Sequence, residues 1–299
     1  MTFPSLPLAP STRIASMLVA AACAIATAPT ASASDAKEVI VAVNSAGMLL
    51  RFNAGQPDKL VDQKPVSGLA AGERLLGIDF RVAKGLLYGL GSSNRLYQID
   101  PATAAATPVG SAPFEVALAG SEFGFDFNPS ADRIRVVGDG GQNLRLHPNT
   151  GVVIDADPKK GDLQTDGALT YEAGDANAGR APRIVGAAYT YNKQDDALTT
   201  NFAIDSALGT LVTQGAREGT QPPVSPNTGR LFTVGSLGVA AFERAAFDIA
   251  DLNNNAYAAL TAAGAKASTW VRIDLTTGKA TPLGTVGGGA AIVGVAVMP

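Results

Sequence analysis

Three aspartates lie at the same place in a repeated five-residue pattern, and of all the residues in this chain they are the best suited to hold a cation. Asp79, Asp126 and Asp248 each follow an apolar, a small and a second apolar residue, and each precedes another apolar residue. Carboxylates brought close together repel one another, which raises their pKa values unless a cation or hydrogen-bond donors compensate. Calcium takes about six to eight oxygen ligands and needs no histidine or cysteine. The three aspartates are therefore a candidate calcium site.

A structural role for the same carboxylates stays open and is the interpretation we favour. Each carboxylate could accept hydrogen bonds from backbone N–H groups or pair with an arginine such as Arg81, Arg133 or Arg135. Loss of such bonds in Asp126→Ala would then cost roughly 1 to 3 kcal/mol of stability. No cofactor is predicted, with calcium as the one possible exception.

Segment 155–183 is the second candidate site. It is rich in Asp and Gly and lies between predicted strands. Irregular segments of this length in compact domains are usually functional or disordered. Asp and Gly are also ordinary turn residues, and the aspartates lack the spacing of a helix-loop-helix calcium loop. The residues predicted to contact a ligand are Asp166, Tyr171, Asp175 and Asn177.

The sequence predicts no catalytic residue. His147 is the single histidine and stands where related hairpins carry Asp100 and Asp274, so it is predicted to be a turn residue. A serine-hydrolase triad would need this histidine, and the chain has no Gly-x-Ser-x-Gly motif. One histidine and one cysteine, Cys23, also cannot form a zinc site or a disulfide framework.

The charge balance excludes a dedicated nucleic-acid binder. Lys and Arg number 23, Asp and Glu number 26, and the net charge is -3. Proteins that bind nucleic acid neutralise phosphates with a basic surface, which this composition does not supply.

The elements that must position the aspartates form a repeat. The five-residue pattern begins at positions 76, 123, 185, 245 and 293, and the copies at 185 and 293 carry Ala in place of Asp. Each copy reads as a short strand, and a hairpin such as 99–110 or 273–284 follows each of the first four copies. The spacings fit blades of four strands with two longer insertions, since propeller repeats take about 40 to 50 residues. The small second residue suits innermost strands, which crowd around the axis.

The two ends of the repeat complete one another. The copy at 293 has no hairpin after it, whereas the strand-like segments 39–43 and 48–52 have no copy before them. A strand near the C-terminus that joins the N-terminal strands would close a ring and remove exposed sheet edges. We therefore predict an all-β fold, a β-propeller of five four-stranded blades closed between N- and C-terminal strands. Six blades is the alternative.

Residues 1–33 are predicted to be a signal peptide. Arg13 precedes an apolar run at 14–26, and Ala31-Ser32-Ala33 offers a cleavage site. The run is shorter than the roughly 20 residues that span a bilayer. The alternative is a lipoprotein acylated at Cys23. Residues 34–299 are predicted to be a single exported domain, periplasmic or extracellular, with no integral membrane segment after removal of the leader.

Eight stretches of the chain carry a family resemblance: Leu75–Phe80, Leu87–Leu90, Arg95–Pro101, Phe123–Pro129, Asp132–Val137, Asn143–Leu146, Gly174–Asn177 and Val185–Tyr189. In these stretches the chain resembles the secreted bacterial family called domain of unknown function 4394, and the match runs over nearly all of the mature chain. The family has no established activity. The resemblance therefore implies a propeller-like extracytoplasmic domain and no catalytic residues.

Two functions remain. The first, which we favour, is a non-catalytic binding or interaction module that presents loops to a protein, a glycan or a small ligand. The second is a calcium-dependent hydrolase of the propeller type, in which an axial ion polarises an ester or a lactone.

Overall fold

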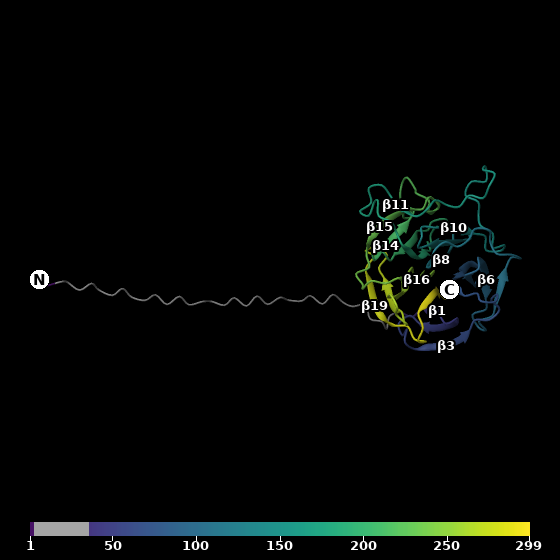
Figure 1. Ribbon diagram of the computed structural model, residues 1–299, viewed down its shortest axis with the longest axis horizontal. Coiled ribbons are helices and arrows are strands. Elements are labelled where there is room, and N and C mark those ends of the chain that lie inside the picture. The colour runs from purple at the N-terminus through teal and green to yellow at the C-terminus, as the bar shows by residue number, and fades with distance from the viewer. Residues whose placement is uncertain (3–35) are drawn as a thin grey trace. The chain divides into compact units, whose positions relative to one another are not determined.

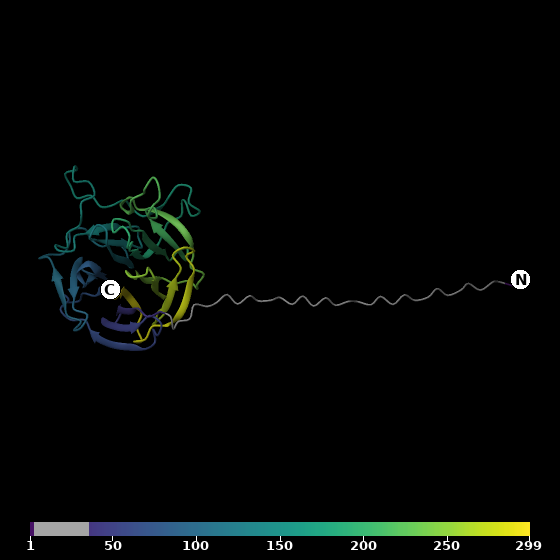
Figure 2. The same cartoon turned by 180° about the vertical axis from the view of Figure 1, so that it is seen from behind.

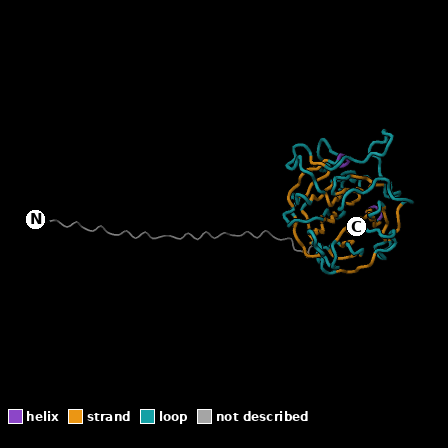
Figure 3. The backbone as a smooth tube through the Cα atoms, viewed as in Figure 1, coloured by secondary structure: helices purple, strands orange, loops and turns teal. Residues whose placement is uncertain are grey.

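The computed structural model describes residues 1–2 and 36–299, and residues 36–299 form a ring of five β-sheets. Strands and the loops between them make up this ring, together with two single-turn 3-10 helices at Val82–Lys84 and Pro226–Thr228 (Figures 1 and 3). The all-β propeller and its five blades are confirmed. The predicted leader and Cys23 lie outside the described residues. No helix in the described part of the chain has the length and hydrophobicity needed to cross a membrane.

Three blades have the predicted four strands, and in each of them the first strand lies nearest the axis and the fourth lies outermost. Blade 1 consists of β4 (Leu75–Arg81), β5 (Leu86–Gly91), β6 (Arg95–Ile99) and β7 (Ala106–Val109). Blade 4 consists of β16 (Arg244–Ile249), β17 (Ala256–Thr261), β18 (Thr269–Ile273) and β19 (Ala280–Thr285). Blade 5 consists of β20 (Ile292–Val297), β1 (Val39–Asn44), β2 (Met48–Asn53) and β3 (Leu60–Pro65).

Blades 2 and 3 depart from four strands because the long insertion lies between them. Blade 2 has β8 (Phe123–Asn128), β9 (Arg133–Gly138) and β10 (Asn143–Leu146), and only the single bridge Leu146–Val153 stands for an outer strand. Blade 3 has β12 (Ile184–Tyr189), β13 (Asn201–Asp205), β14 (Thr210–Gln214) and β15 (Arg230–Ser236). A fifth strand, β11 (Thr170–Tyr171), comes from the insertion and pairs parallel with β15.

The ring closes by pairing β20 with β1, as the sequence predicts. The two strands are antiparallel, with Ile40 opposite Val297 and Val43 opposite Gly294. The C-terminus lies beside β1 in the middle of the ring in both views (Figures 1 and 2). Blade 5 is therefore built from both ends of the described ring.

Tight turns follow the hairpin repeat that the sequence shows. The carboxylates of Asp100 and Asp274 accept backbone N–H bonds from residues two positions later, at 2.8 and 2.7 Å. His147 Nδ1 accepts the same bond from the backbone N–H of Asn149 at 3.2 Å. The single histidine is thus a turn residue, as its place in the repeat predicts.

Small residues on the innermost strands allow the blades to approach one another. A Cβ on Gly124 would lie 2.6 Å from the backbone nitrogen of Ala187 in the next blade, and a Cβ on Gly294 would lie 2.7 Å from that of Ile78. Apolar side chains fill each of the five spaces between neighbouring blades. The cluster between blades 2 and 3 is smaller than the others, and a buried polar network occupies part of that interface.

Candidate functional site on the ring axis

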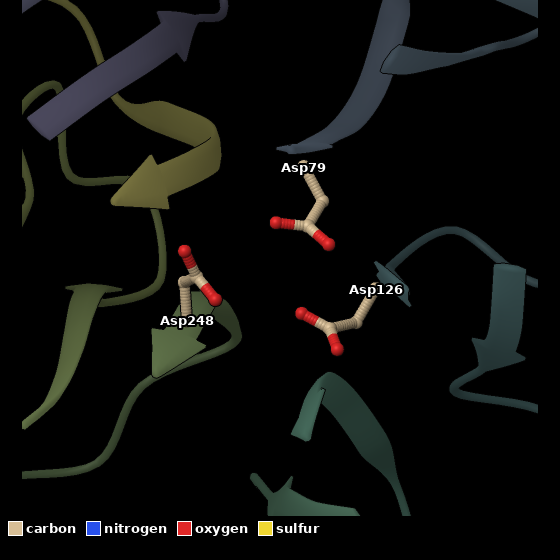
Figure 4. A group of neighbouring side chains, drawn as sticks. All are labelled: Asp79, Asp126 and Asp248. Carbon is tan, nitrogen blue, oxygen red and sulfur yellow. The ribbon is translucent and has the colours of Figure 1, made fainter. Parts of the chain in front are cut away.

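The three repeated aspartates meet near the axis of the ring. Asp79 comes from β4, Asp126 from β8 and Asp248 from β16, and one carboxylate oxygen of each lies within 4.8 Å of the others. All three side chains are buried, and Figure 4 shows the carboxylates turned toward one another. These are the residues that could hold a metal ion in the described part of the chain.

Backbone N–H groups from all five blades donate to these three carboxylates. Asp79 and Asp248 each accept two such bonds, of 2.7 and 2.7 Å and of 2.6 and 2.6 Å, and Asp126 accepts one of 2.9 Å. The donors are Phe80, Phe127, Tyr189, Ile249 and Val297. Each is the residue that follows the fourth position of the repeated pattern. Three of these bonds join neighbouring blades: Asp79 binds blade 2, Asp126 binds blade 3 and Asp248 binds blade 5.

The two alanines of the pattern, Ala188 and Ala296, explain how three carboxylates accept hydrogen bonds from five backbone donors. Where a blade carries Asp, that side chain accepts the N–H of the next blade, as Asp79 does with Phe127. Ala188 and Ala296 cannot do this for the blades that follow them. In each of those following blades, the aspartate accepts the N–H of the next residue in its own strand. Asp79 accepts the N–H of Phe80, and Asp248 accepts the N–H of Ile249.

Burial and mutual repulsion raise the pKa values of these carboxyl groups. Burial, followed by the charge of Asp248, raises the pKa of Asp79 well above its ordinary value, and burial followed by the charges of both neighbours does the same for the pKa of Asp126. Burial raises the pKa of Asp248 to about 7. Hydrogen bonds from the backbone N–H groups of Val297 and Ile249 limit this rise. Among the described residues, no N–H group donates to Asp126 Oδ1, and Asp126 shares side-chain hydrogen bonds with both neighbours. Asp126 is therefore the carboxyl group of the three that accepts the fewest N–H bonds.

Tyr191 is a neighbour of the cluster that the sequence does not reveal. Burial, and then the charges of Asp79, Asp126 and Asp248, raise the pKa of its phenol. Its backbone is fixed by Asn254, which accepts from the Tyr191 N–H and donates to the Tyr191 carbonyl, both at 2.9 Å. Tyr191 follows a strand whose copy of the pattern has no aspartate, so no local pattern places it there.

The arginines proposed as partners bind elsewhere. Arg81 forms an ion pair with Asp132, and Arg135 forms one with Asp166 at 2.6 Å. Of the two structural alternatives drawn from the sequence, backbone donors rather than arginines hold the central carboxylates.

The four residues predicted to contact a ligand do not form one site. Asp166 is buried between Arg135 and Arg145, which donate to its two oxygens at 2.6 to 2.8 Å. The Tyr171 hydroxyl donates to Asp205 at 2.6 Å. Asp175 and Asn177 both bind Thr233 of β15. These contacts attach the insertion to blades 2 and 3, and a ligand-contact role for the four residues stays a prediction.

A pocket opens on the axis where the innermost strands begin, and we call this end of the ring the N-side mouth. The cavity has a volume of about 110 Å³. Its wall combines residues from blades 1, 2, 4 and 5, which are Asn44, Ser45, Gly47, Arg74, Leu75, Leu76, Ser121, Glu122, Phe123, Arg244 and Val293. We refer to it as the N-side pocket. No sequence motif marks it, because the ring brings together residues far apart in the chain.

Comparison with known proteins gives a family and a set of distant structures. The family model described as domain of unknown function (DUF4394) matches residues 48–296. No curated protein matches the chain.

The solved structures resemble the ring at low sequence identity. They include a protein of unknown function from Bacteroides thetaiotaomicron (16% identity, TM-score 0.42, 82% of this chain and 57% of that one). A chain of the nidogen/laminin complex matches with 12% identity, a TM-score of 0.44 and coverage of 88% and 98%. Glutaminyl cyclase from Myxococcus xanthus matches with 10% identity, a TM-score of 0.42 and coverage of 73% and 78%. This chain thus spans little more than half of the first of these proteins, and the likenesses carry no inference about activity.

Proposed function

The chain belongs to the family described as domain of unknown function 4394, and on that premise we propose that it is an exported, non-catalytic binding module whose ligand occupies the N-side pocket. The observation that carries the proposal is the pocket itself. It lies on the axis, and five separate segments of the chain contribute side chains or backbone to its wall. Loops and strand ends held by a rigid scaffold are the usual place for a binding site.

The scaffold behind this pocket is fixed from two sides. β20 and β1 close the ring, and the three buried carboxylates join the innermost strands of blade 1 to blade 2, of blade 2 to blade 3 and of blade 4 to blade 5. A site whose walls do not move on binding loses little free energy to ordering. Rigid walls therefore favour recognition of a small ligand by a pocket of this size.

Blocking the pocket is expected to abolish binding of small ligands. Ser45 lines the pocket and is exposed, so a Ser45→Trp side chain would fill the mouth without disturbing the core. Ala46 is the next residue of the same turn, is exposed and does not line the pocket, so Ala46→Trp is the matched control. The measurement is ligand-observed NMR with a library of small organic fragments. Fragments that no longer bind Ser45→Trp but still bind Ala46→Trp support the proposal. Fragments that bind both variants as they bind the unaltered protein refute it.

A calcium-dependent hydrolase is the second candidate, and the convergence of Asp79, Asp126 and Asp248 is what favours it. A bound calcium ion would polarise the carbonyl group of an ester or a lactone. Calcium takes about six to eight oxygen ligands, whereas this group supplies three carboxylates that already accept five backbone hydrogen bonds. The binding module is therefore the better supported function.

Metal analysis separates the two functions. We expect purified protein to contain well under one calcium per chain, and its melting temperature to be unchanged after treatment with a chelator, because backbone N–H groups already compensate the carboxylates. Both quantities can be measured on the same preparation, by elemental analysis and by thermal unfolding. Stoichiometric calcium that a chelator removes would instead support the hydrolase.

A further inference from the structure

The charges around the N-side pocket do not cancel. Arg244 donates to both carboxylate oxygens of Glu122, at 2.7 and 2.6 Å, so this pair is neutral as a unit. Arg74 also lines the pocket, and in the described part of the chain it has no ion-pair partner. The pocket therefore carries one uncompensated positive charge in a protein whose net charge is -3.

Asn44 leaves a hydrogen-bond donor unused at the same wall. Its side chain is only 2% exposed, and its Oδ1 accepts the backbone N–H groups of Ala46 and Met48 at 3.1 and 3.0 Å. These two bonds fix the amide, so that its Nδ2 is the donating end, and this nitrogen has no partner among the described residues. The protein itself covers this nitrogen, so it is closed to a ligand in the pocket, and Arg74 is the group that offers a charge there.

The remaining wall is apolar. Leu75, Leu76, Phe123 and Val293 line the pocket beside these polar groups. A cavity of ~150 Å³ is known to hold a molecule the size of benzene. A cavity of about 110 Å³ therefore fits a slightly smaller hydrocarbon group.

We propose that the N-side pocket binds a small monocarboxylate, whose carboxylate pairs with Arg74 and whose hydrocarbon part lies against Leu76, Phe123 and Val293. This inference rests on the proposed function, because it names the ligand class of the same pocket. Arginine suits the task, since its guanidinium donates two parallel hydrogen bonds to a carboxylate.

The test compares acids with their neutral amides. Acetate, propionate, isobutyrate and benzoate are titrated into the full protein beside acetamide, propionamide, isobutyramide and benzamide, and binding is followed by NMR. We expect at least one acid to bind about tenfold or more tightly than its amide, because only the acid can pair with the guanidinium. N-acetylalanine is included to distinguish the free acid of a small molecule from the carboxyl terminus of a peptide.

Two charge-matched variants locate the interaction. Arg74→Gln is expected to remove the preference for acids while leaving the amides unaffected. Arg180→Gln removes the same charge from an exposed residue that does not line the pocket, and it is expected to leave the preference intact. An equal loss in both variants would show that the acids respond only to net charge, and it would overturn the inference.

The outcomes also separate this inference from the proposed function. Amides that bind as tightly as acids, with both lost in Ser45→Trp, would refute the carboxylate class and leave the binding module in place. If neither the acids, the amides nor the fragment library binds, both proposals are refuted. If N-acetylalanine binds more tightly than every small acid, the ligand is the carboxyl end of a peptide, and the free monocarboxylate is refuted.

Discussion

Asp248→Asn is expected to destabilise the protein by about 1 to 3 kcal/mol, whereas Asp126→Asn at the equivalent position is expected to be neutral or stabilising at neutral pH. Asp248 accepts two backbone N–H bonds, one from Ile249 and one from Val297, both at 2.6 Å. An amide at this position has only one oxygen, so its NH₂ group would face a buried N–H donor. The bond to Val297 also joins blade 4 to β20, which closes the ring.

Asp126→Asn is the matched control because only one backbone N–H group, that of Tyr189, donates to this residue. The amide oxygen can keep that bond, and the substitution removes a carboxyl group that repels Asp79 and Asp248. Free energies of unfolding from urea titrations of the three proteins measure the difference. Equal destabilisation by the two substitutions would contradict the idea that the number of backbone N–H bonds sets the cost at each position.

The same cluster makes stability depend on pH. The pKa of Asp248 rises from 3.8 in the unfolded chain to about 7 in the native protein, and the pKa values of Asp79 and Asp126 rise well above 3.8. Between these pH values the native state holds more protons than the unfolded state, so the free energy of unfolding falls as pH rises. Carboxylates with a lowered pKa, such as Asp132 and Asp139, have the opposite effect on stability, and they change it only near and below their unfolded pKa of 3.8. Asp126→Asn should flatten the decline above pH 3.8, where the unfolded chain has begun to lose the protons that the native state keeps.

Asp166→Ala is expected to cost about 3 to 5 kcal/mol, the second large effect. Asp166 is almost completely buried, and its two oxygens receive hydrogen bonds from Arg135 and Arg145 at 2.6 to 2.8 Å. Arg135 is 2% exposed, so removal of Asp166 leaves a buried guanidinium without its counter-charge. Thermal and urea unfolding measure the loss, and the interface between blades 2 and 3 should open first.

Glu172→Ala provides the comparison for this prediction. Glu172 pairs with Arg230 at 2.9 Å on the surface of blade 3, where water screens both charges. This change is expected to cost less than about 1 kcal/mol. If Asp166→Ala costs no more than Glu172→Ala, the buried network does not hold the insertion to the ring.

The repeated pattern was sufficient to predict the fold and the meeting of Asp79, Asp126 and Asp248, because equivalent positions in a ring lie at equivalent distances from its axis. Closure by 293–297 could be predicted for a similar reason, since a ring cannot leave one blade without its innermost strand. The outer strands of blades 2 and 3 could not, because the insertion replaces one of them by a single bridge and adds β11 to the other.

The N-side pocket could not be predicted from the sequence at all. Asn44, Arg74 and Arg244 stand at three unrelated places in the chain, and only ring closure brings them to one mouth. Asp166 was singled out for the composition of its segment, although its partner Arg135 belongs to a strand of blade 2 and no local pattern connects them. Sequence periodicity thus predicts what repeats, and the pocket and the polar network are features that occur once.

Closure through β1 and β20 also governs how the protein can reach its native state. Pairing of these strands must wait until residue 297 has been synthesised, although β1 is among the first strands made. Contacts between such distant parts of a chain form slowly. During that delay the free edge of β1 is open to the β20 of another molecule, so two chains at high concentration can trade this strand and become an interlocked dimer with the same hydrogen bonds.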